Sequence, residues 1–536
     1  MKYLGLLLVL ISNASIAQVP QDFVVEIEPI TVTNAPGIHS YSWGMTSDHK
    51  WVIIGGRIDG LHQRQPFAAF QESDNNQNVF VIDPATDQTW LAGLNTLSTP
   101  LFEQLQSTNQ QFIQRDSTLY IVGGYGRSAT ANDHLTYPNL TAVSIDGLAN
   151  AVINGTSINS FFRQITDVNL KVTGGQLGYL DSTFYLVGGH LFDGAYNPMG
   201  PDHGPGFTQE YTNEIRTFEL LDDGTNLTIA NYQAVQDTVN LHRRDYNMAP
   251  QIFPNGELGY TAFSGVFDPN DMPYLNSVDI TSPTSYVTNN SFNQYLSQYH
   301  SAKLPIYDTA ANVMHTLFFG GLSQFTLAAA GNLVEDTDVP FVKTISRVTR
   351  DASGAMQEID LDYVEMPSLV GSGAEFIPLH QYYYPNEVLD LNSVPAAKTL
   401  VGYIYGGIES TQANIFFTNN GTQSFASNVI FKVFINKGEA GLNSELALTN
   451  ENIINLHVSP NPVVDDLNLE FFGVSLQQMK VSLFDAQGRL LQKVTHKVSG
   501  IGTQELQLST ADLKAGVYVV KVGNGVVSDQ QKFVKK

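Results

Sequence analysis

Six short apolar runs, each ending in a pair of small residues, constrain the fold of this chain more than any other feature. Each run is rich in β-branched and aromatic residues and stops at glycine, which is the pattern of a buried strand rather than of a helix. The paired glycines permit a positive φ and close packing of the backbone against a neighbour. The six copies are Trp51–Gly56, Leu119–Gly124, Phe184–Gly189, Tyr260–Gly265, His315–Gly321 and Gly402–Gly407.

The second residues of these pairs are 68, 65, 76, 56 and 86 residues apart, which indicates a repeated supersecondary unit. In the first copy the glycine strand follows His39–Trp43 and precedes Asn78–Asp83 and Thr86–Trp90. The order is strand, glycine-pair strand, strand ending in Asp-Pro, and strand ending in Trp. This unit resembles a kelch repeat, although the fourth copy has Ser264 in place of the first glycine.

The resemblance implies an all-β fold in which residues 18–437 form a six-bladed, kelch-like β-propeller of the kind that galactose oxidase also contains. The last copy offers only three strands, near Ala374–Pro378, Val401–Gly406 and Asn428–Asn436. We expect Phe23–Ile30, near the start of the mature chain, to supply the fourth strand. That pairing would close the ring and cover an open sheet edge.

Residues 1–17 have the pattern of a secretory signal. Lys2 is followed by the apolar stretch Leu4–Ile11, and Ser15–Ala17 supplies small residues for cleavage. A buried N-terminal helix is the alternative interpretation. No later stretch is long and apolar enough to predict a transmembrane helix.

The amino-acid composition excludes several classes of binding partner and of catalytic chemistry. With a formal charge of -24, the 536-residue chain would be repelled by phosphate backbones, so we expect no nucleic acid partner. The chain has no cysteine, which excludes disulfides, thiol nucleophiles and the Tyr–Cys copper cofactor of galactose oxidase. We expect no cofactor and no metal site, because no metal-binding or nucleotide-binding motif occurs.

A second domain is expected over residues 453–536, after a polar linker at 438–452. Alternating strands and short turns predict a small antiparallel β-sandwich. The segments Ser459–Pro462, Asp485–Gly488, Leu513–Tyr518 and the basic C-terminus resemble the C-terminal sorting domain of type IX secretion cargo in Bacteroidetes-type bacteria. The resemblance implies recognition by that secretion machinery and delivery, through the periplasm, to the cell surface or the medium. An Ig-like binding module is the alternative.

The most suggestive segment for ligand binding is Arg243-Arg244-Asp245, at or just before the inner strand of the fourth copy. Inner strands of a propeller line the axial channel, where ligands bind. The arginines could clamp a carboxylate or a polar sugar, with Asp245 orienting it. Alternatively, the three residues could make salt bridges between blades.

Two histidines, His300 and His190, complete the predicted ligand site. His300 and His39 each precede a serine, and we expect them to occupy equivalent repeat positions, facing the channel or serving a structural role. His190 follows the third glycine pair in a long loop, and such loops often carry binding surface. No catalytic residue is predicted.

The leading hypothesis is an exported, non-catalytic propeller that binds a glycan or a protein. The rival hypothesis is a carbohydrate-active enzyme, such as a sugar epimerase or lyase, with its site at the axial channel. A structural or adhesive surface protein is the third. An enzyme should have a deep axial pocket with convergent charged groups, whereas a channel filled by apolar side chains would exclude it.

Overall fold

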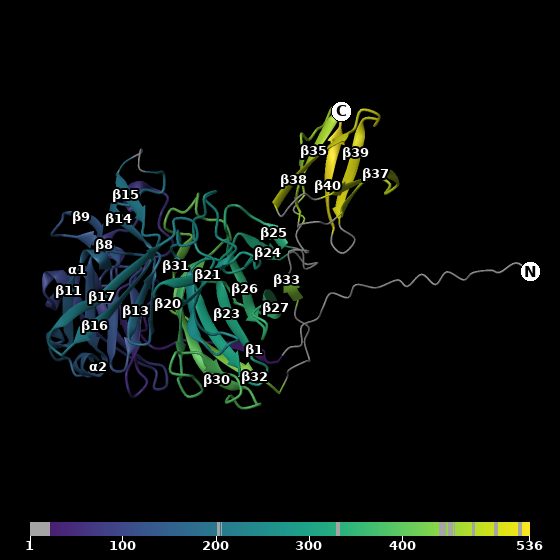
Figure 1. Ribbon diagram of the computed structural model, residues 1–536. Coiled ribbons are helices and arrows are strands. Elements are labelled where there is room, and N and C mark those ends of the chain that lie inside the picture. Colours follow the sequence, from purple (N-terminus) through teal and green to yellow (C-terminus); the bar gives the residue numbers. More distant parts are fainter. Residues whose placement is uncertain are drawn as a thin grey trace, which may run out of the picture. The chain divides into compact units, whose positions relative to one another are not determined.

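The computed structural model describes residues 22–200, 204, 206–327, 333–438, 446–448, 454, 456–473, 478–497, 502–523 and 528–536. The predicted signal at 1–17 lies outside the described residues, as does most of the expected linker, in which β33 (Leu446–Leu448) is described. The chain divides into a large unit, Gln21–Thr326 with Asp336–Asn443, and a small unit formed mainly by Ser444–Lys536. Each unit is built from strands, which confirms the all-β expectation (Figure 1).

The large unit contains six main sheets, each of which includes four antiparallel strands, and short extra strands extend the fifth and sixth sheets. Strands that are neighbours in the chain are also neighbours in these sheets, except that the N-terminal strand joins the sixth sheet. The first sheet is formed by β2 (Ser42–Met45), β3 (Trp51–Ile54), β4 (Asn78–Asp83) and β5 (Gln88–Gly93). The second is formed by β6 (Gln111–Arg115), β7 (Thr118–Val122), β10 (Asn139–Ser144) and β11 (Phe162–Thr166). The third is formed by β12 (Gln176–Leu180), β13 (Thr183–Val187), β16 (Glu214–Asp222) and β17 (Leu227–Gln236).

The remaining three sheets follow the same plan. The fourth is formed by β18 (Asn247–Ile252), β19 (Leu258–Phe263), β20 (Ser277–Ser282) and β21 (Ser285–Asn289). The fifth is formed by β22 (Ala302–Asp308), β23 (Val313–Leu322), β26 (Phe341–Arg350) and β27 (Met356–Glu365). The sixth is formed by β28 (Leu369–Pro378), β30 (Thr399–Ser410), β32 (Ile430–Asn436) and β1 (Val24–Ile30).

Shorter elements join these sheets. The helices α1 and α2 lie beside the first two sheets, and two short strands and three two-stranded sheets extend the loops, the third of these sheets being β24 (Phe325–Leu327) with β25 (Leu333–Glu335). Their bounds are α1 (Thr99–Leu105), α2 (Ile145–Ile153), β8 (Tyr125–Ser128), β9 (Asp133–Thr136), β14 (His190–Gly194), β15 (Phe207–Tyr211), β29 (Leu389–Asp390) and β31 (Ser424–Ala426). In the described residues, no helix is long and apolar enough to cross a membrane.

The recurring glycine pairs directly follow the second strand in four sheets, as the sequence predicts, and lie within the longer second strands β23 and β30 of the other two. Both residues of every pair adopt a positive φ, including Ser264 at 48° in the fourth copy. A side chain on Gly123 would place Cβ 2.0 Å from the carbonyl oxygen of Val172, which leads into the next sheet. Only glycine permits that approach, so the repeat reflects close packing between successive sheets.

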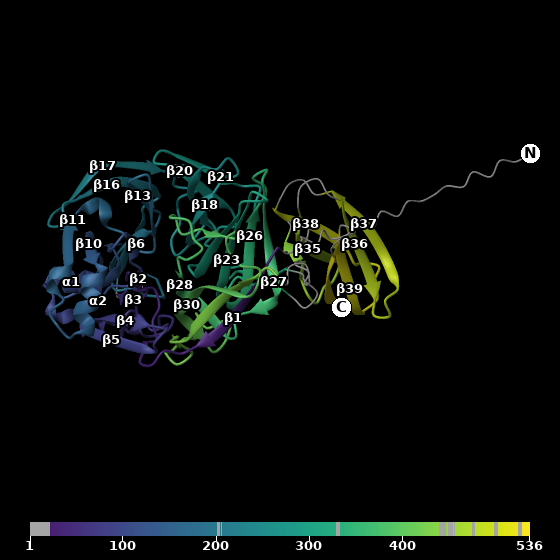
Figure 2. The same ribbon diagram turned by 90° about the horizontal axis from the view of Figure 1, so that it is seen from below.

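A circle of six backbone hydrogen bonds joins the six sheets just before their first strands. Each N–H donates to the carbonyl oxygen of the equivalent residue in the preceding sheet, at 2.7 to 3.2 Å, and the first donates to the last. In Figure 2, β2, β6, β18 and β28 lie toward the middle of this unit and β5, β11, β17 and β21 lie at its rim. The circle consists of Ser40, Asn109, Gly174, Asp245, His300 and Gly373.

The N-terminal strand completes the sixth sheet, as predicted. Strand β1 pairs antiparallel with β32 from Val24, opposite Asn436, to Ile30, opposite Ile430. Strands from the two ends of the large unit therefore share one sheet, and the ring is closed by hydrogen bonds rather than by a covalent link.

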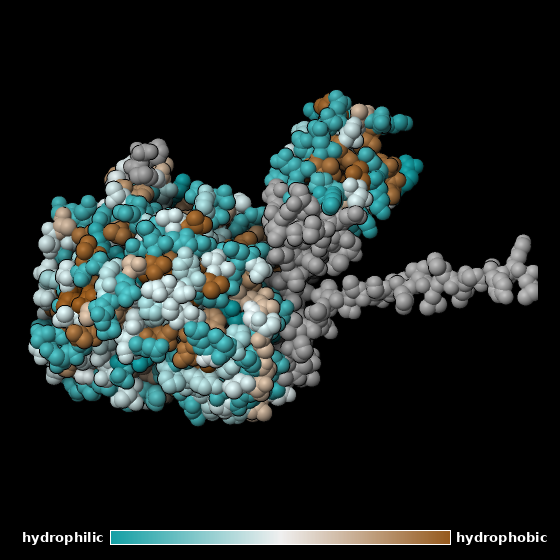
Figure 3. All heavy atoms as spheres, viewed as in Figure 1, coloured by the Kyte–Doolittle hydropathy of each residue, from teal (hydrophilic) through white to brown (hydrophobic). Residues whose placement is uncertain are grey.

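Apolar clusters fill the spaces between successive sheets. Between the first and second sheets, Val52, Val81, Leu119 and Val143 are fully buried with α2 packed beside them. Equivalent clusters follow around the ring. On the face drawn in Figure 3, the surface carries apolar residues in small patches separated by polar ones.

The small unit is an antiparallel β-sandwich, as predicted for the C-terminal residues. One sheet contains β34, β35 and β38, and the other contains β37, β36, β39 and β40, in these orders. Leu467, Leu469, Val481 and Val520 from the two sheets share one buried core. The strands are β34 (His457–Ser459), β35 (Asp466–Gly473), β36 (Gln478–Asp485), β37 (Leu490–Lys497), β38 (Gly502–Ser509), β39 (Gly516–Gly523) and β40 (Ser528–Lys535).

A buried carboxyl in the fifth sheet makes stability depend on pH. Glu358 accepts hydrogen bonds from the backbone of Tyr295 at 2.6 Å and of Leu296 at 3.1 Å. Burial nevertheless dominates and raises the pKa of Glu358 from 4.5 to about 8. The folded state therefore holds this proton more tightly than the unfolded state, and the resulting stabilisation is lost as the pH rises from 4.5 toward 8.

We expect Glu358→Gln, which stays uncharged, to remove this dependence. Relative to the parent, the variant should gain about 2–4 kcal/mol of unfolding free energy between pH 5 and pH 9. Urea unfolding at both pH values measures the change. The control is Asp360→Asn, because the pKa of Asp360 is raised only to about 6 and its effect should be complete near that pH. Parallel stability curves for the parent and Glu358→Gln would contradict the prediction.

Candidate functional site

An axial cavity lies on one side of the hydrogen-bonded circle. Its volume is about 150 Å³, and residues from the first strands of all six sheets line it. Because those strands converge on one axis, side chains far apart in sequence meet there. The aromatic part of the wall consists of Trp43, Phe112, Tyr179, Tyr260 and Phe376.

A histidine–carboxylate pair lies at the end of the cavity next to the circle. His300 belongs to the circle through its backbone, and its Nε2 lies 3.0 Å from Oε1 of Glu375 on β28. The Glu375 side chain is 8% exposed. The pair joins the fifth and sixth sheets and presents an acid and a base to the same space.

A second charged group lies at the other end of the cavity. Glu387 comes from the segment between β28 and β30, while Arg115 ends β6 and Lys303 lies on β22. Desolvation by the surrounding protein raises the pKa of Glu387, and the two cations oppose that shift only in part. Arg115 also lies over the ring of Tyr179, 4.3 Å from its centroid.

Four residues of this wall present buried polar atoms that have no hydrogen-bond partner among the described residues. These atoms are Oε1 of Gln111, Nε of Arg115, Nε2 of His300, and Nδ2 and Oδ1 of Asn386. Buried polar groups in proteins are almost always hydrogen-bonded, so such atoms at a cavity indicate a polar occupant. The cavity is therefore a candidate site for a small ligand with several hydroxyl groups.

The five residues predicted from sequence occupy different places. Arg243 is fully buried outside the cavity: its Nε donates to Asn240 at 2.6 Å, and its Nη atoms donate to the backbone of Ser264 and to Asn276. Its guanidinium also lies 4.1 Å from the ring centroid of Tyr274. Every nitrogen of the guanidinium is engaged by the segments that precede or connect the strands of the fourth sheet.

Arg244, Asp245 and His190 meet near the circle. Arg244 forms an ion pair with Asp245 and donates to the Tyr211 hydroxyl at 3.1 Å, and the Tyr211 ring lies 5.9 Å from that of His190. Burial lowers the pKa of His190 well below its usual value, with a smaller contribution from Arg244. His190 begins strand β14, so the expected irregular loop is a hairpin at this point.

The expected equivalence of His39 and His300 is wrong by one residue. The hydrogen-bonded circle aligns His300 with Ser40, so His39 corresponds to Tyr299. The two histidines therefore occupy different positions in their repeats and make different contacts. His300 contacts Glu375 in the cavity, whereas Nε2 of His39 lies 3.7 Å from Asp59.

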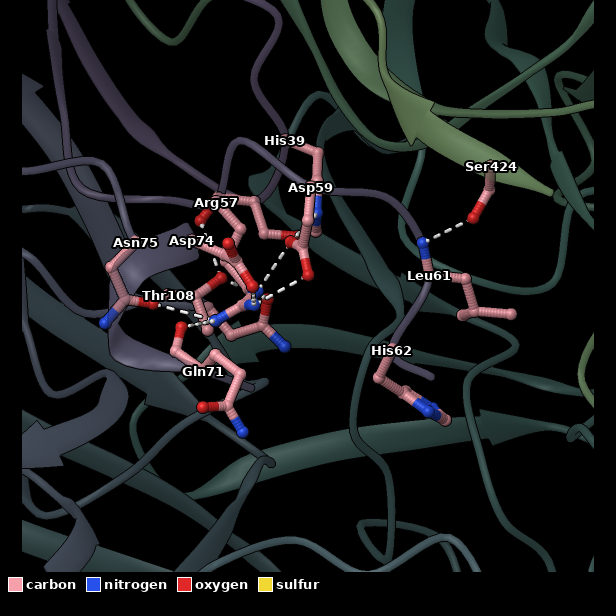
Figure 4. Close-up of polar contacts among 12 residues, drawn as sticks. His39, Arg57, Asp59, Leu61, His62, Gln71, Asp74, Asn75, Thr108 and Ser424 are labelled. Atoms are coloured by element: carbon pink, nitrogen blue, oxygen red, sulfur yellow. Dashed lines mark hydrogen bonds and ion pairs between the residues drawn. The ribbon is translucent and has the colours of Figure 1, made fainter. Parts of the chain in front are cut away.

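Asp59 belongs to a polar cluster beyond the circle, shown in Figure 4. Arg57 donates to both oxygens of Asp59, at 2.8 and 2.7 Å, and to Oδ1 of Asn75 at 2.8 Å. Burial alone would raise the pKa of Asp59, but interactions with His39 and Arg57 lower it to about 2. The hydrogen bonds from Arg57 to Asp59 and Asn75 hold the loop that follows β3.

Sequence reasoning missed most of the cavity's charged groups. Glu375 could have been found, because it lies within the predicted strand Ala374–Pro378 and is the one charged residue there. Arg115 and Lys303 lie outside the segments that the sequence pattern singled out, so no repeat position pointed to them. Asn386 and Glu387 lie in a segment without any repeat pattern, and only the folded chain brings them to the axis.

Comparisons with known proteins identify the C-terminal unit. The family described as "Secretion system C-terminal sorting domain" matches residues 457–536. This confirms the predicted sorting domain, and the protein is type IX secretion cargo that is exported to the cell surface or the medium. No curated protein matches the chain. The solved structure titled "Structure of YjhT" is similar at 11% identity, covering 78% of this chain and 99% of that chain, with a TM-score of 0.41.

Replacing Arg243 should affect folding rather than binding. We expect Arg243→Ala to lower the free energy of unfolding by about 3–5 kcal/mol, because it leaves buried acceptors unpaired. Arg244→Ala should cost less, since the Arg244 side chain is 20% exposed. Urea unfolding of both variants measures the difference, and equal losses would contradict the assignment.

Proposed function

We propose that the large unit is a six-bladed β-propeller of the kelch type, and that it binds a small polyhydroxylated ligand, of monosaccharide size, in its axial cavity. The six four-stranded sheets, the closing strand β1 and the recurring glycine pairs support the propeller assignment. The sorting domain exports this binding unit to the cell surface or the medium. The ligand is therefore an extracellular molecule.

The observation that carries this proposal is the composition of the cavity wall. It combines aromatic faces, two carboxylates, two cations and the unpartnered amide of Asn386. Ligand pockets typically pair apolar walls with a few placed polar groups. A cavity near 150 Å³ limits the ligand to a small molecule, which favours a single sugar ring over a longer glycan or a peptide.

The location of these groups also favours a small ligand over a protein partner. Protein interfaces need well over 1,000 Å² of contact, of which the buried core is apolar. The convergent polar groups described above face an internal cavity, and on the face drawn in Figure 3 the apolar residues of the large unit are scattered.

A second candidate is a carbohydrate-active enzyme, such as a sugar epimerase or lyase, with its site in the same cavity. His300 beside Glu375, and Glu387 with its raised pKa, are potential acid–base groups at opposite ends of the space. General acid–base catalysis favours groups whose pKa approaches the working pH. Following any bound sugar by NMR over time distinguishes turnover from binding alone.

Titration calorimetry against a monosaccharide panel tests the binding proposal. The purified protein should bind at least one sugar, and Glu375→Gln should weaken that binding at least tenfold by removing a buried charged partner, a change of about 1.4 kcal/mol. Asp223→Asn is the control, because Asp223 is exposed and remote from the cavity wall. Absence of heat with every sugar, or unchanged binding by Glu375→Gln, would contradict the proposal.

Removing the sorting domain should stop export across the outer membrane. In a bacterium with a type IX system, a chain lacking residues 457–536 should stay in the cell, and the full chain should reach the surface or medium. Cell fractionation and immunoblotting measure this. The Glu375→Gln full-length chain is the control and should be exported normally. Equal export of the shortened chain would show that another segment carries the signal.

A further inference from the structure

The two ends of the axial cavity are built differently. At one end, the circle of backbone hydrogen bonds closes the axis, and Ser40, Asn109 and Asp245 leave a space of only about 20 Å³ beside it. At the other end, the wall includes Pro385, Asn386 and Glu387, which belong to the connection between β28 and β30 rather than to any first strand. The connection between β28 and β30 therefore supplies the part of the cavity wall that the repeated strands do not form.

The three residues form the tip of a tight turn. The backbone N–H of Tyr384 donates to the carbonyl of Val388 at 2.9 Å, and the N–H of Glu387 donates to the carbonyl of Tyr384 at 2.9 Å. Glu387 has a φ of 65°, in the left-handed region that bulky residues rarely adopt. Strain of this kind persists where the surroundings fix the backbone, and it is concentrated at functional sites.

Anchors on both sides hold the turn in place. After it, Val388 and Leu389 are fully buried, and β29 pairs in parallel with β22 through Leu389, opposite Ile306. Before it, the Tyr383 hydroxyl donates to the carbonyl of Val401 at 2.9 Å. The turn is thus a preorganised part of the cavity wall, and a ligand need not order it on binding.

The side chains of Asn386 and Glu387, at the tip of the turn, are suited to forming hydrogen bonds with hydroxyl groups. The Asn386 amide offers a donor and an acceptor, both buried and without a partner in the described part of the chain. Two adjacent hydroxyls can satisfy both atoms at once, since each hydroxyl donates and accepts. The Glu387 carboxyl, next along the chain, accepts from a further hydroxyl.

The charges around the cavity favour a neutral ligand. Arg115 and Lys303 act on Glu387, and His300 lies against Glu375, so each carboxylate already has a cationic or protonatable partner. An anionic sugar would compete with these carboxylates for the same cations. A neutral ring would instead use the remaining hydrogen-bonding capacity of the wall.

We propose that the turn Tyr384–Val388 determines the specificity of the axial site, with Asn386 and Glu387 selecting a neutral six-membered sugar ring that carries adjacent hydroxyls. This inference rests on the proposed function, because it concerns the ligand of the same cavity. A sugar that lacks one of the paired hydroxyls leaves an Asn386 atom buried and unpaired, which is the basis of strong discrimination.

Titration calorimetry with glucose, galactose, mannose, 2-deoxyglucose and glucuronic acid tests the inference on the full chain. The parent should prefer one neutral hexose over its epimers and over the uronic acid. Asn386→Ala should weaken that sugar at least tenfold and reduce the preference between epimers to less than about threefold. Ser393→Ala, on the same connection but outside the cavity wall, should change neither value.

The outcomes separate this inference from the proposed function. A parent that binds no sugar overturns both. A parent that binds with unchanged affinity and epimer preference in Asn386→Ala overturns the inference alone, as does a preference for glucuronic acid. Thermal unfolding checks that each variant folds. If Asn386→Ala does not fold, Glu387→Gln takes its place and should also reduce epimer preference, and an unchanged preference would overturn the inference.

Discussion

Six backbone hydrogen bonds, one between each pair of successive sheets, are the contact on which the rest of the large unit depends. They form a closed circle, so the first strands of all six sheets must point toward one axis. Five of the six residues adopt a positive φ, and at Gly174 and Gly373 this conformation carries no steric cost. The circle closes only when the sixth sheet meets the first. The pairing of β1 with β32 completes that sixth sheet.

The closed circle explains why charged side chains gather at the axis of the large unit, although few residues of the chain are charged. The spaces between sheets are filled by apolar clusters, so a charged side chain on a first strand can keep its solvation only at the axis. There, Nε2 of His300 lies 3.0 Å from Oε1 of Glu375, and Lys303 and Arg115 act on Glu387. By contrast, Arg243 lies in the segment before β18, where the backbone carbonyls of Asn240, Ser264 and Asn276 accept hydrogen bonds from its guanidinium.

Sequence predicted the repeated architecture closely, because its signals are local. A positive φ at a strand end requires glycine or a tolerant substitute such as Ser264, and alternating apolar residues fix the strands of the C-terminal sandwich. The candidate site was predicted less well. Arg244, Asp245 and His300 do lie near the axis. His39, however, is one residue out of register with His300 and lies against Asp59, and the connection carrying Asn386 shows no repeat pattern.

The sequence by itself determined the six repeats, the place of the N-terminal strand in the sixth sheet and the sorting domain, since each depends on a short segment with a fixed period or motif. Only the tertiary structure decided which polar residues share the axial cavity. Arg115, His300, Glu375 and Glu387 lie on four separate segments, and ring closure alone sets their distances. A polar side chain can stabilise the fold or form part of a binding wall, depending on which partners lie near it in the folded chain. No local sequence pattern encodes those partners.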